Sequence, residues 1–294
     1  MRILVIVNPI SGRGAAVVSA RRLGLALLQR GHSVEQRVTR RAGDAERFAR
    51  ECEHSFDRIV IAGGDGTLNE VLNGLSDPSS VPIAYLALGT ANLLARDLDL
   101  PRDPEGVARL VESGAIRRID LGRIGDRCFL ANVGVGFDAL IVQEIGRTRR
   151  GVLGYRSYVG PILRSLAAYR PPQIEVRIDG EKPRVCAWVV VSNLRNYGGL
   201  FEVSDRAGCD SGRLELCLFE RAKAADIARY FTAGMRGRLA RARGVSLHQA
   251  RRVHIGGDGV PIQVDGDAWG TTPAVLEIQP AAASILVSAD ARAN

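Results

Sequence analysis

The sequence predicts two domains of different class: a doubly wound α/β domain, followed by a mainly antiparallel β domain with some helix inserted. In the N-terminal part, short apolar runs alternate with helical patterns through glycine-containing turns, which is typical of a parallel sheet covered by helices. Further along, apolar and polar residues alternate one by one, as in residues 174–179, which is typical of strands with one exposed face. We place the boundary near Asp120, and the 294 residues suffice for two separate cores.

Strand–turn–helix units account for the first domain. Its strands are short apolar runs, expected at residues 3–7, 34–38, 58–62 and 83–88. Its helices are expected at residues 15–30, from Asp44, after residue 66, and at residues 91–97. The third of these helices shows one apolar face at the spacing i, i+3, i+4, i+7, formed by Leu68, Val71, Leu72 and Leu75.

The second domain, residues 121–279, is predicted from strand patterns and a hairpin signal at Asp179-Gly180. Its further strands are expected at residues 185–191, 214–219, 253–255, 262–264 and 275–278. Helices are expected at residues 142–169 and 224–242.

Composition excludes several classes of protein. No apolar run is long enough to span a bilayer, and the first run is too short for a signal peptide, so we expect a cytoplasmic protein. Five scattered cysteines without a C-x-x-C pair indicate neither a disulfide framework nor a zinc site. The only lysines are Lys182 and Lys223, and no G-x-x-x-x-G-K exists, which excludes a P-loop NTPase. The net charge of +8 comes without any nucleic-acid-binding motif, so we expect no nucleic-acid partner.

Glycine-containing turns follow three of the predicted strands, after Val7, Ala62 and Leu88. Such turns can converge on one edge of a parallel sheet, where helix N-termini and glycine backbones suit phosphate groups. The turn Gly63-Gly64-Asp65-Gly66-Thr67 fits best, with Thr67 and Asn69 able to add hydrogen bonds. One turn alone would indicate only an ordinary helix cap, but three together predict a phosphate site.

Two similar glycine patterns are set aside. Gly256-Gly257-Asp258-Gly259 precedes a strand pattern and not a helix, so we expect a hairpin turn there. Gly134-Val135-Gly136 lacks the third glycine of a dinucleotide-binding fingerprint.

Taken in order, a set of motifs resembles the diacylglycerol kinase catalytic-domain family, which includes bacterial diacylglycerol and related lipid kinases and the sphingosine and ceramide kinases. The segment Gly63 to Val71 resembles the family's nucleotide loop. The other matching segments are Asn8-Pro9-x-Ser11-Gly12, Thr39 before Gly43-Asp44-Ala45, Leu88 to Asn92, Asp120-Leu121-Gly122, Gly134-x-Gly136-Phe137-Asp138-Ala139 and Val264-Asp265-Gly266-Asp267. They span nearly the whole chain.

The resemblance implies a nucleotide-binding domain, a β-sandwich domain, an active site in the cleft between them, and a C-terminal segment (residues 280–294) that returns to the first domain, residues 1–120. It implies ATP and Mg²⁺ as cofactors. Asp65 and Asp120 match positions near the metal, acting through water. The positions that would contact ATP are Asn8, Pro9, Ile10, Ser11, Gly12, Thr39, Gly63, Gly64, Asp65, Gly66, Thr67, Leu68, Asn69 and Thr90.

The family's catalytic base belongs to an Asp-Gly-Glu motif, which here is Asp265-Gly266-Asp267. The chemistry asks for a carboxylate within hydrogen-bond reach of the acceptor hydroxyl, and phosphoryl transfer depends more on positioning than on a strong base. We therefore predict Asp267 as the base, with Asp265 as its partner or substitute. A tight turn at Asp265-Gly266 is compatible with this role.

The chain departs from the family at two other places. Ala87 replaces a proline that many relatives have before the Gly-Thr turn, which should change stiffness more than chemistry. Cys209-Asp210-Ser211-Gly212 lacks one carboxylate of an Asp-Asp-Gly turn that holds a structural magnesium in some bacterial members, so we predict no metal there.

The resemblance makes a lipid alcohol the expected substrate, with diacylglycerol the first choice of acceptor and a sphingoid base the second, in lipid metabolism and phospholipid biosynthesis. Transient peripheral contact with an anionic membrane surface is expected through the basic runs at 147–150 and 229–243, although a solvated helix face is an equal interpretation. A homodimer is left open.

Two other functions are alternatives. NAD kinases share the glycine turn, but Asn8-Pro9, the turn at Thr90 and the late Asp265-Gly266-Asp267 are evidence against that class. A catalytically degenerate nucleotide- or lipid-binding module is favoured only by Asp267 in place of glutamate.

Overall fold

The structure of the chain is a computed structural model that describes all residues except 53, 149–159, 161–165, 167–168, 200 and 289–294. It divides into two compact units. The first consists of Met1–Asp120 with the chain from Ala281 onward, and the second is Leu121–Pro280. Among the described residues, no helix is long and apolar enough to cross a membrane.

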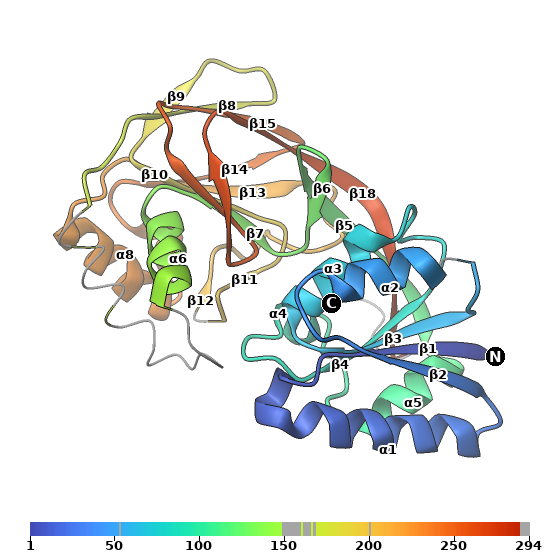
Figure 1. Cartoon of the computed structure of the whole chain (residues 1–294). Coiled ribbons are helices and arrows are strands. Elements are labelled where there is room, and N and C mark those ends of the chain that lie inside the picture. The colour runs from blue at the N-terminus through green and yellow to red at the C-terminus, as the bar shows by residue number, and fades with distance from the viewer. Residues whose placement is uncertain (53, 149–159, 161–165, 167–168, 200, 289–294) are drawn as a thin grey trace. The chain divides into compact units, whose positions relative to one another are not determined.

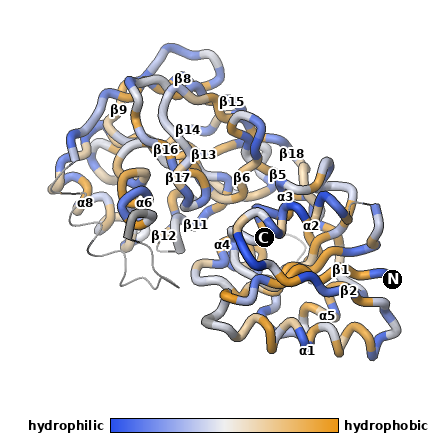
Figure 2. The backbone as a smooth tube through the Cα atoms, in the orientation of Figure 1, coloured by the Kyte–Doolittle hydropathy of each residue, from blue (hydrophilic) through white to orange (hydrophobic). Residues whose placement is uncertain are grey.

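The first unit is built on a parallel sheet with the strand order β2-β1-β3-β4, which the last residues of β18 extend through Ile285, paired with Ile83 (Figure 1). The strands are β1 (Arg2–Val7), β2 (Ser33–Val38), β3 (Arg58–Gly63), β4 (Ile83–Ala87) and β18 (Ala274–Val287). Strands β1, β3 and β4 are almost wholly buried, because helices cover both faces of the sheet. Figure 2 shows these strands in the colours of hydrophobic residues.

Helices lie on both sides of this sheet, which confirms the doubly wound α/β prediction. On one face, α1 (Ala15–Gln29) and α5 (Pro104–Ser113) share an apolar core with alternate strand residues such as Val5 and Val60. On the other face lie α2 (Asp44–Cys52) and α3 (Asp65–Gly74) (Figure 1). The sequence patterns did not reveal α5, although it begins with a recognisable cap: the Asp103 carboxylate accepts the Gly106 N–H at 2.8 Å, and Pro104 follows it.

The core of the second unit lies between two large antiparallel layers of strands, which confirms the predicted β-sandwich. One sheet has the order β14-β13-β10-β7-β16-β17, and the other contains β15, β8, β9 and the first residues of β18, with β5 and β6 also attached. Alternate apolar residues of both sheets, such as Val189, Leu216, Val253 and Leu276, form the core between them. The strand bounds are β5 (Ala115–Ile124), β6 (Arg127–Phe129), β7 (Asn132–Val135), β8 (Ile174–Ile178), β9 (Arg184–Cys186), β10 (Trp188–Ser192), β13 (Leu214–Phe219), β14 (Val245–Ala250), β15 (Arg252–Gly256), β16 (Pro261–Val264) and β17 (Asp267–Thr271).

A second apolar cluster covers the outer face of the six-stranded sheet. Here α6 (Phe137–Thr148) and α8 (Ala224–Met235) pack on aromatic residues, and Trp188 stacks on Phe219 with ring centroids 3.9 Å apart. Short elements complete this layer: β11 (Asn196–Tyr197), β12 (Phe201–Glu202) and the 3-10 turn η3 (Leu239–Arg241). The first unit has two further short elements, η1 (Ser11–Gly14) and α4 (Leu93–Asp97).

Three details of the second domain differ from the sequence prediction. The helix predicted at 142–169 begins earlier, at Phe137, and most of its later part lies outside the described residues. The helix predicted at 224–242 ends at Met235, because Gly237 adopts φ +63°. Gly256 to Gly259 is not a hairpin turn, since β15 and β16 belong to different sheets and the turn carries the chain from one sheet to the other. The hairpin at Asp179-Gly180 is confirmed by the pairing of β8 with β9.

The contact between α2 and α3 generates a stability prediction. A Cβ atom on Gly74 would collide with the Glu46 carbonyl oxygen and lie 2.9 Å from the Ala49 Cβ atom. We expect Gly74→Ala to destabilise the protein by about 1–3 kcal/mol, because the two helices must move apart. Calorimetric unfolding measures this. The control is Gly146→Ala, also in a helix, where a Cβ atom meets nothing within 4 Å and unfolding should occur at an unchanged or slightly higher temperature. Equal effects of the two substitutions would contradict the packing argument.

Candidate active site

The three glycine-containing turns of the first unit meet at the carboxyl edge of its parallel sheet. The Leu88 N–H donates to the Gly63 carbonyl at 2.7 Å, which joins the turns after β3 and β4. Asn8 Nδ2, in the turn after β1, donates to Thr67 Oγ1 at 3.0 Å. Gly12, with φ +60°, approaches so closely that a Cβ atom on it would lie 3.2 Å from the Leu88 carbonyl oxygen. The expected convergence of the turns therefore holds.

Glycine is required here by the packing of one turn on another. A Cβ atom on Gly89 would lie 2.6 Å from the Gly64 Cα atom, and one on Gly64 would lie 3.1 Å from the Gly89 Cα atom. At Gly63 the obstacle would be the Thr67 side chain, 2.8 Å away. Backbone thus touches backbone at this edge, and the start of α3 is held in place without bulky side chains in front of it.

Side chains brace the same two turns. The Asp65 carboxylate accepts the Leu93 N–H at the start of α4 through Oδ1 at 2.9 Å. Asn92, in the left-handed conformation with φ +51°, accepts the Gly89 N–H at 2.8 Å and returns a hydrogen bond to the Gly89 carbonyl at 2.9 Å. The buried Tyr85 hydroxyl lies 3.2 Å from Asn92 Oδ1 and 3.5 Å from Asp65 Oδ1. Burial raises the pKa of Tyr85 well above its usual value, so it remains a neutral donor.

Tyr85 and Asn92 were not among the predicted site residues. Asn92 belongs to the Gly-Thr-Ala-Asn segment, and an asparagine just before a helix is a signal for a left-handed residue that could have revealed it. Tyr85 has no such signal, because it lies in an apolar strand and only the fold directs its hydroxyl towards Asp65.

The remaining predicted nucleotide residues are distributed as follows. Pro9, Ile10 and Ser11 lie in the first turn, and the Thr39 N–H donates to the Val7 carbonyl at 2.9 Å beside it. Thr90 is an exposed residue of the third turn. Asn69 is half-buried on α3, where its side chain accepts from Asn73 Nδ2 at 3.0 Å. Leu68 is fully buried, and its N–H donates to the Gly64 carbonyl at 3.1 Å.

The two predicted metal-binding carboxylates have structural partners. Asp65 caps α4, as described above, while the buried Asp120 accepts the Ala281 N–H at 2.8 Å and so fixes β18 where it enters the first unit. In the part of the chain that the structure describes, no group of three or more His, Cys, Asp or Glu side chains could hold a metal ion.

The second unit carries the Asp265-Gly266-Asp267 turn between β16 and β17. Asp265 has φ +49°, and its carboxylate accepts three backbone N–H groups: Leu130 at 2.7 Å, Ala131 at 2.8 Å and Asn132 at 2.9 Å. Burial raises the pKa of Asp265, and these amide donors oppose the rise. Both of its oxygens are engaged, so its evident work is to anchor the turn.

Asp267 is the exposed carboxylate of this turn. It is the first residue of β17, and no side chain or amide within the described residues hydrogen-bonds or ion-pairs with it. The two aspartates of the motif, separated by Gly266, therefore differ: the Asp265 carboxylate holds the backbone, while that of Asp267 is exposed.

Both domains of the chain match families of known proteins. Residues 2–124 match the family described as "Diacylglycerol kinase catalytic domain", and residues 131–287 match "YegS C-terminal NAD kinase beta sandwich-like domain". The chain is 29% identical to a protein named diacylglycerol kinase from Mycobacterium tuberculosis (strain ATCC 25618 / H37Rv), over 97% of this chain and 94% of that protein. It is 28% identical to one of the same name from Bacillus subtilis (strain 168), over 92% and 91%.

Solved structures share the fold. The crystal structure of a diacylglycerol kinase from Bacillus anthracis str. Sterne superposes with a TM-score of 0.75 at 19% identity, covering 99% of this chain and 98% of that one. An NAD kinase from Archaeoglobus fulgidus, in complex with ATP, gives a TM-score of 0.58 at 16% identity, covering 99% and 95%. With both of its domains matched in order, the chain belongs to the diacylglycerol kinase catalytic-domain family.

Proposed function

We propose that this protein is an ATP-dependent lipid kinase, which transfers the terminal phosphoryl group of ATP to the hydroxyl of a lipid alcohol. The observation that carries the proposal is the edge where three glycine turns interlock around the start of α3. The names of the relatives support diacylglycerol as the acceptor. A sphingoid base is the alternative acceptor.

The nucleotide phosphates would lie against the first turn of α3, where backbone N–H groups and the helix dipole favour negative charge. The similarity in fold to an NAD kinase in complex with ATP supports ATP as the nucleotide. Mg²⁺ would be held mainly by the phosphates and its own waters, with Asp65 and Asp120 contributing through water. Mg²⁺ keeps several waters in such sites, and when bound it neutralises phosphate charge. A hydrated cation of this kind needs few ligands from the protein, and the single carboxylate at this edge, Asp65, is consistent with such a site.

At the acceptor, Asp267 is the proposed base. Its carboxylate would accept the proton of the lipid hydroxyl as the oxygen attacks phosphorus, while Asp265 holds the turn through its amide contacts. Aspartate is shorter than the family's glutamate by one methylene, so the hydroxyl must approach closer to the turn. Since phosphoryl transfer depends chiefly on positioning and charge neutralisation, a rigid turn matters more than a strong base.

The role of Asp267 can be tested with a nearly isosteric substitution. We expect Asp267→Asn to lower kcat for phosphorylation of diacylglycerol by at least about a hundredfold while ATP binding persists, because only proton acceptance is lost. The measurement uses labelled ATP, magnesium and a panel of diacylglycerol, sphingosine and NAD, with identification of the product. The control is Asp258→Asn, which changes an exposed aspartate in the turn Gly256-Gly257-Asp258-Gly259. Retained turnover in Asp267→Asn would remove this residue from the base role, and an NAD phosphate product would overturn the lipid assignment.

The carboxyl edge of the parallel sheet, where we place the nucleotide and which we call the nucleotide edge, yields a second prediction. Gly64→Val should weaken ATP binding by at least about tenfold, because the added side chain separates the two turns and obstructs the phosphates. Equilibrium binding of ATP measures this. In the control, Gly256→Val, an added Cβ atom would lie 3.6 Å from the Glu175 Cβ atom, an ordinary contact. ATP affinity equal to wild type in a folded Gly64→Val protein would show that the phosphates bind elsewhere.

Contact with an anionic membrane is part of this proposal, because the acceptor resides in a bilayer. Of the basic runs predicted for it, the side chains of Arg147 to Arg150 lie outside the described residues. Arg229 is committed to an ion pair with Asp226 at 2.8 Å. Arg236, Arg238 and Arg241 are exposed beyond the end of α8 and retain their predicted role.

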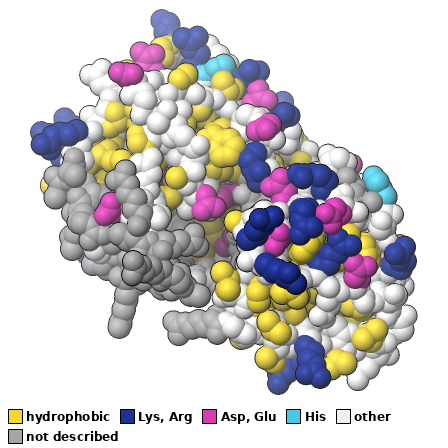
Figure 3. Space-filling view, viewed as in Figure 1, with side chains coloured by type: hydrophobic (Ala, Val, Ile, Leu, Met, Phe, Trp, Pro, Cys, Tyr) yellow, Lys and Arg dark blue, Asp and Glu magenta, His cyan; other side chains and the backbone are white. Residues whose placement is uncertain are grey.

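The outer face of α1 is a stronger candidate for this contact. Val17, Val18, Leu25 and Leu28 are about half exposed along it, next to Arg21 and Arg22, and the helix contains no acidic residue. Figure 3 shows aliphatic and basic side chains along the edge of the first unit where α1 runs. Apolar residues with arginines suit an anionic lipid surface. Arg21 and Arg22 lie at the middle of α1, so a symmetric contact between two copies through this face would bring like charges together. This repulsion favours a lipid surface over a second copy as the partner.

Vesicle binding tests the membrane contact. Phosphatidylcholine vesicles that contain phosphatidylglycerol should bind the protein, and high salt should release it. Val18→Glu, at 56% exposure on α1, should weaken binding, whereas Val185→Glu, at 60% exposure on β9, should not. Salt-insensitive binding, or equal effects of the two substitutions, would contradict a role for α1. A concentration-dependent dimer that Val18→Glu dissociates would identify a second copy as the partner instead.

A further inference from the structure

Asp138 is a buried carboxylate at the start of α6 that receives hydrogen bonds on both oxygens. Oδ1 accepts from the Ala139 N–H at 3.0 Å and from Trp188 Nε1 at 3.0 Å. Oδ2 accepts from the Tyr197 hydroxyl at 2.9 Å and from Gln263 Nε2 at 3.1 Å. Burial raises the pKa of Asp138, and these donors oppose the rise. Burying a carboxyl group is costly unless its hydrogen bonds are satisfied, and four donors satisfy those of Asp138.

The chain makes room for this carboxylate at Gly134. A Cβ atom on Gly134 would overlap the Asp138 side chain, so no other residue fits there without displacing it. The Gly134-x-Gly136 pattern, which does not fit a dinucleotide-binding fingerprint, thus has a physical explanation. It accommodates Asp138 beneath the six-stranded sheet.

Gln263 connects Asp138 to the Asp265-Gly266-Asp267 turn. Its Nε2 also donates to Asn132 Oδ1 at 3.0 Å, and its Oε1 accepts the Gly266 N–H at 2.8 Å. The orientation of the amide is set by these partners, because both groups near Nε2 are acceptors and Gly266 supplies a donor. Asn132 contacts the turn as well, since its N–H donates to Asp265 and its carbonyl accepts the Asp265 N–H at 2.9 Å.

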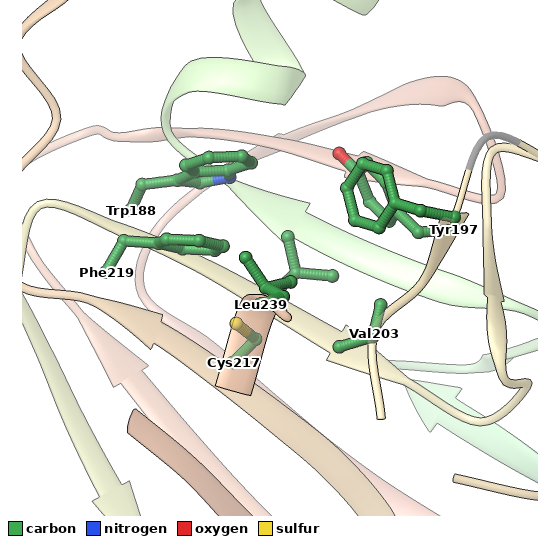
Figure 4. Close-up of a pocket in the computed structure, with 8 residues that line it drawn as sticks. Trp188, Tyr197, Val203, Cys217, Phe219 and Leu239 are labelled. Atoms are coloured by element: carbon green, nitrogen blue, oxygen red, sulfur yellow. The ribbon is translucent and has the colours of Figure 1, made fainter. Parts of the chain in front are cut away.

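The other end of this network is the wall of an apolar pocket. Trp188 and Tyr197 line that pocket, and Figure 4 shows Trp188 stacked on Phe219 with Tyr197 across from them. The other lining residues are Val190, Phe201, Val203, Cys217 and Leu239. The rings of Trp188 and Tyr197 therefore border the pocket while their polar atoms hold Asp138.

From these contacts, we propose that Asp138 and Gln263 are positioning residues for the candidate base Asp267, and that Trp188 and Tyr197 couple the packing of the apolar pocket to its turn. This inference rests on the proposed function. The physical need arises from the turn itself, because Asp265 at φ +49° and Gly266 at φ +86° both lie in the left-handed region. For a residue with a side chain this backbone state is costly, so it persists only where the surroundings hold it.

A matched pair of tyrosine substitutions tests the coupling. Tyr197→Phe removes one donor to Asp138 and keeps the ring. The control is Tyr169→Phe, whose hydroxyl donates instead to the Ala187 carbonyl at 2.8 Å and whose ring packs at 5.3 Å from that of Phe137. We expect Tyr197→Phe to lower kcat for lipid phosphorylation about tenfold with an unchanged KM for ATP, since the base is displaced while the nucleotide edge is intact. Tyr169→Phe should keep the wild-type kcat. Equal kcat values for the two variants, or a change confined to KM for ATP, would overturn the proposal.

Hydrogen–deuterium exchange provides a readout that does not require activity. Exchange of the Gly266 amide should be at least about tenfold faster in Gln263→Leu than in wild type, because its acceptor is removed, and faster in Tyr197→Phe than in Tyr169→Phe. Unchanged exchange in Gln263→Leu would overturn the network whatever the activity. If the wild-type protein phosphorylates no lipid yet the exchange follows this pattern, the proposed function fails and the network stands as a support of the turn alone.

Discussion

The candidate nucleotide site depends on the close approach of Gly64 and Gly89, the backbones of two turns that follow neighbouring strands. Parallel pairing of β3 with β4 places both turns at one edge, and the absence of side chains on these residues lets them touch. Asp65 and Asn92 then join the turns to the start of α4. In the proposed function, backbone amides at this edge face the phosphates, and such amides are effective only when the turns that carry them are rigid.

The second unit uses hydrogen-bonded carboxylates for a comparable purpose. Asp265 is held by three backbone N–H groups, and Asp138 by one backbone N–H and three side-chain donors, from Trp188, Tyr197 and Gln263. Each of these acids gives up its own reactivity, since all four oxygens are occupied, and together they fix the backbone that presents Asp267. A carboxylate that must accept a proton has to remain accessible. The three aspartates differ in whether their oxygens accept hydrogen bonds: those of Asp138 and Asp265 do, whereas Asp267 is exposed.

The fold alone leaves the acceptor open. A diacylglycerol kinase and an NAD kinase both superpose on this chain, with TM-scores of 0.75 and 0.58, although their acceptors differ as their names state. Function resides in sites placed on a fold. The nucleotide edge is compatible with either class, and the names of the relatives, together with the match to the diacylglycerol kinase catalytic domain, are what connect this chain with lipid kinases.

Local pattern by itself determined much of this protein: the strands of the first domain, the three glycine turns after Val7, Ala62 and Leu88, and the alternation that indicates a β-sandwich. Each of these is encoded within a few neighbouring residues, so the sequence can be read for them. Only the tertiary structure decided that Asp265 anchors its turn while Asp267 stays exposed, that Gln263 joins Asp138 to that turn, and that Tyr85 braces the nucleotide turns. In these cases the deciding partner lies far along the chain, as Leu130 does from Asp265, or on a neighbouring strand or turn, and no local pattern records which groups folding brings into contact.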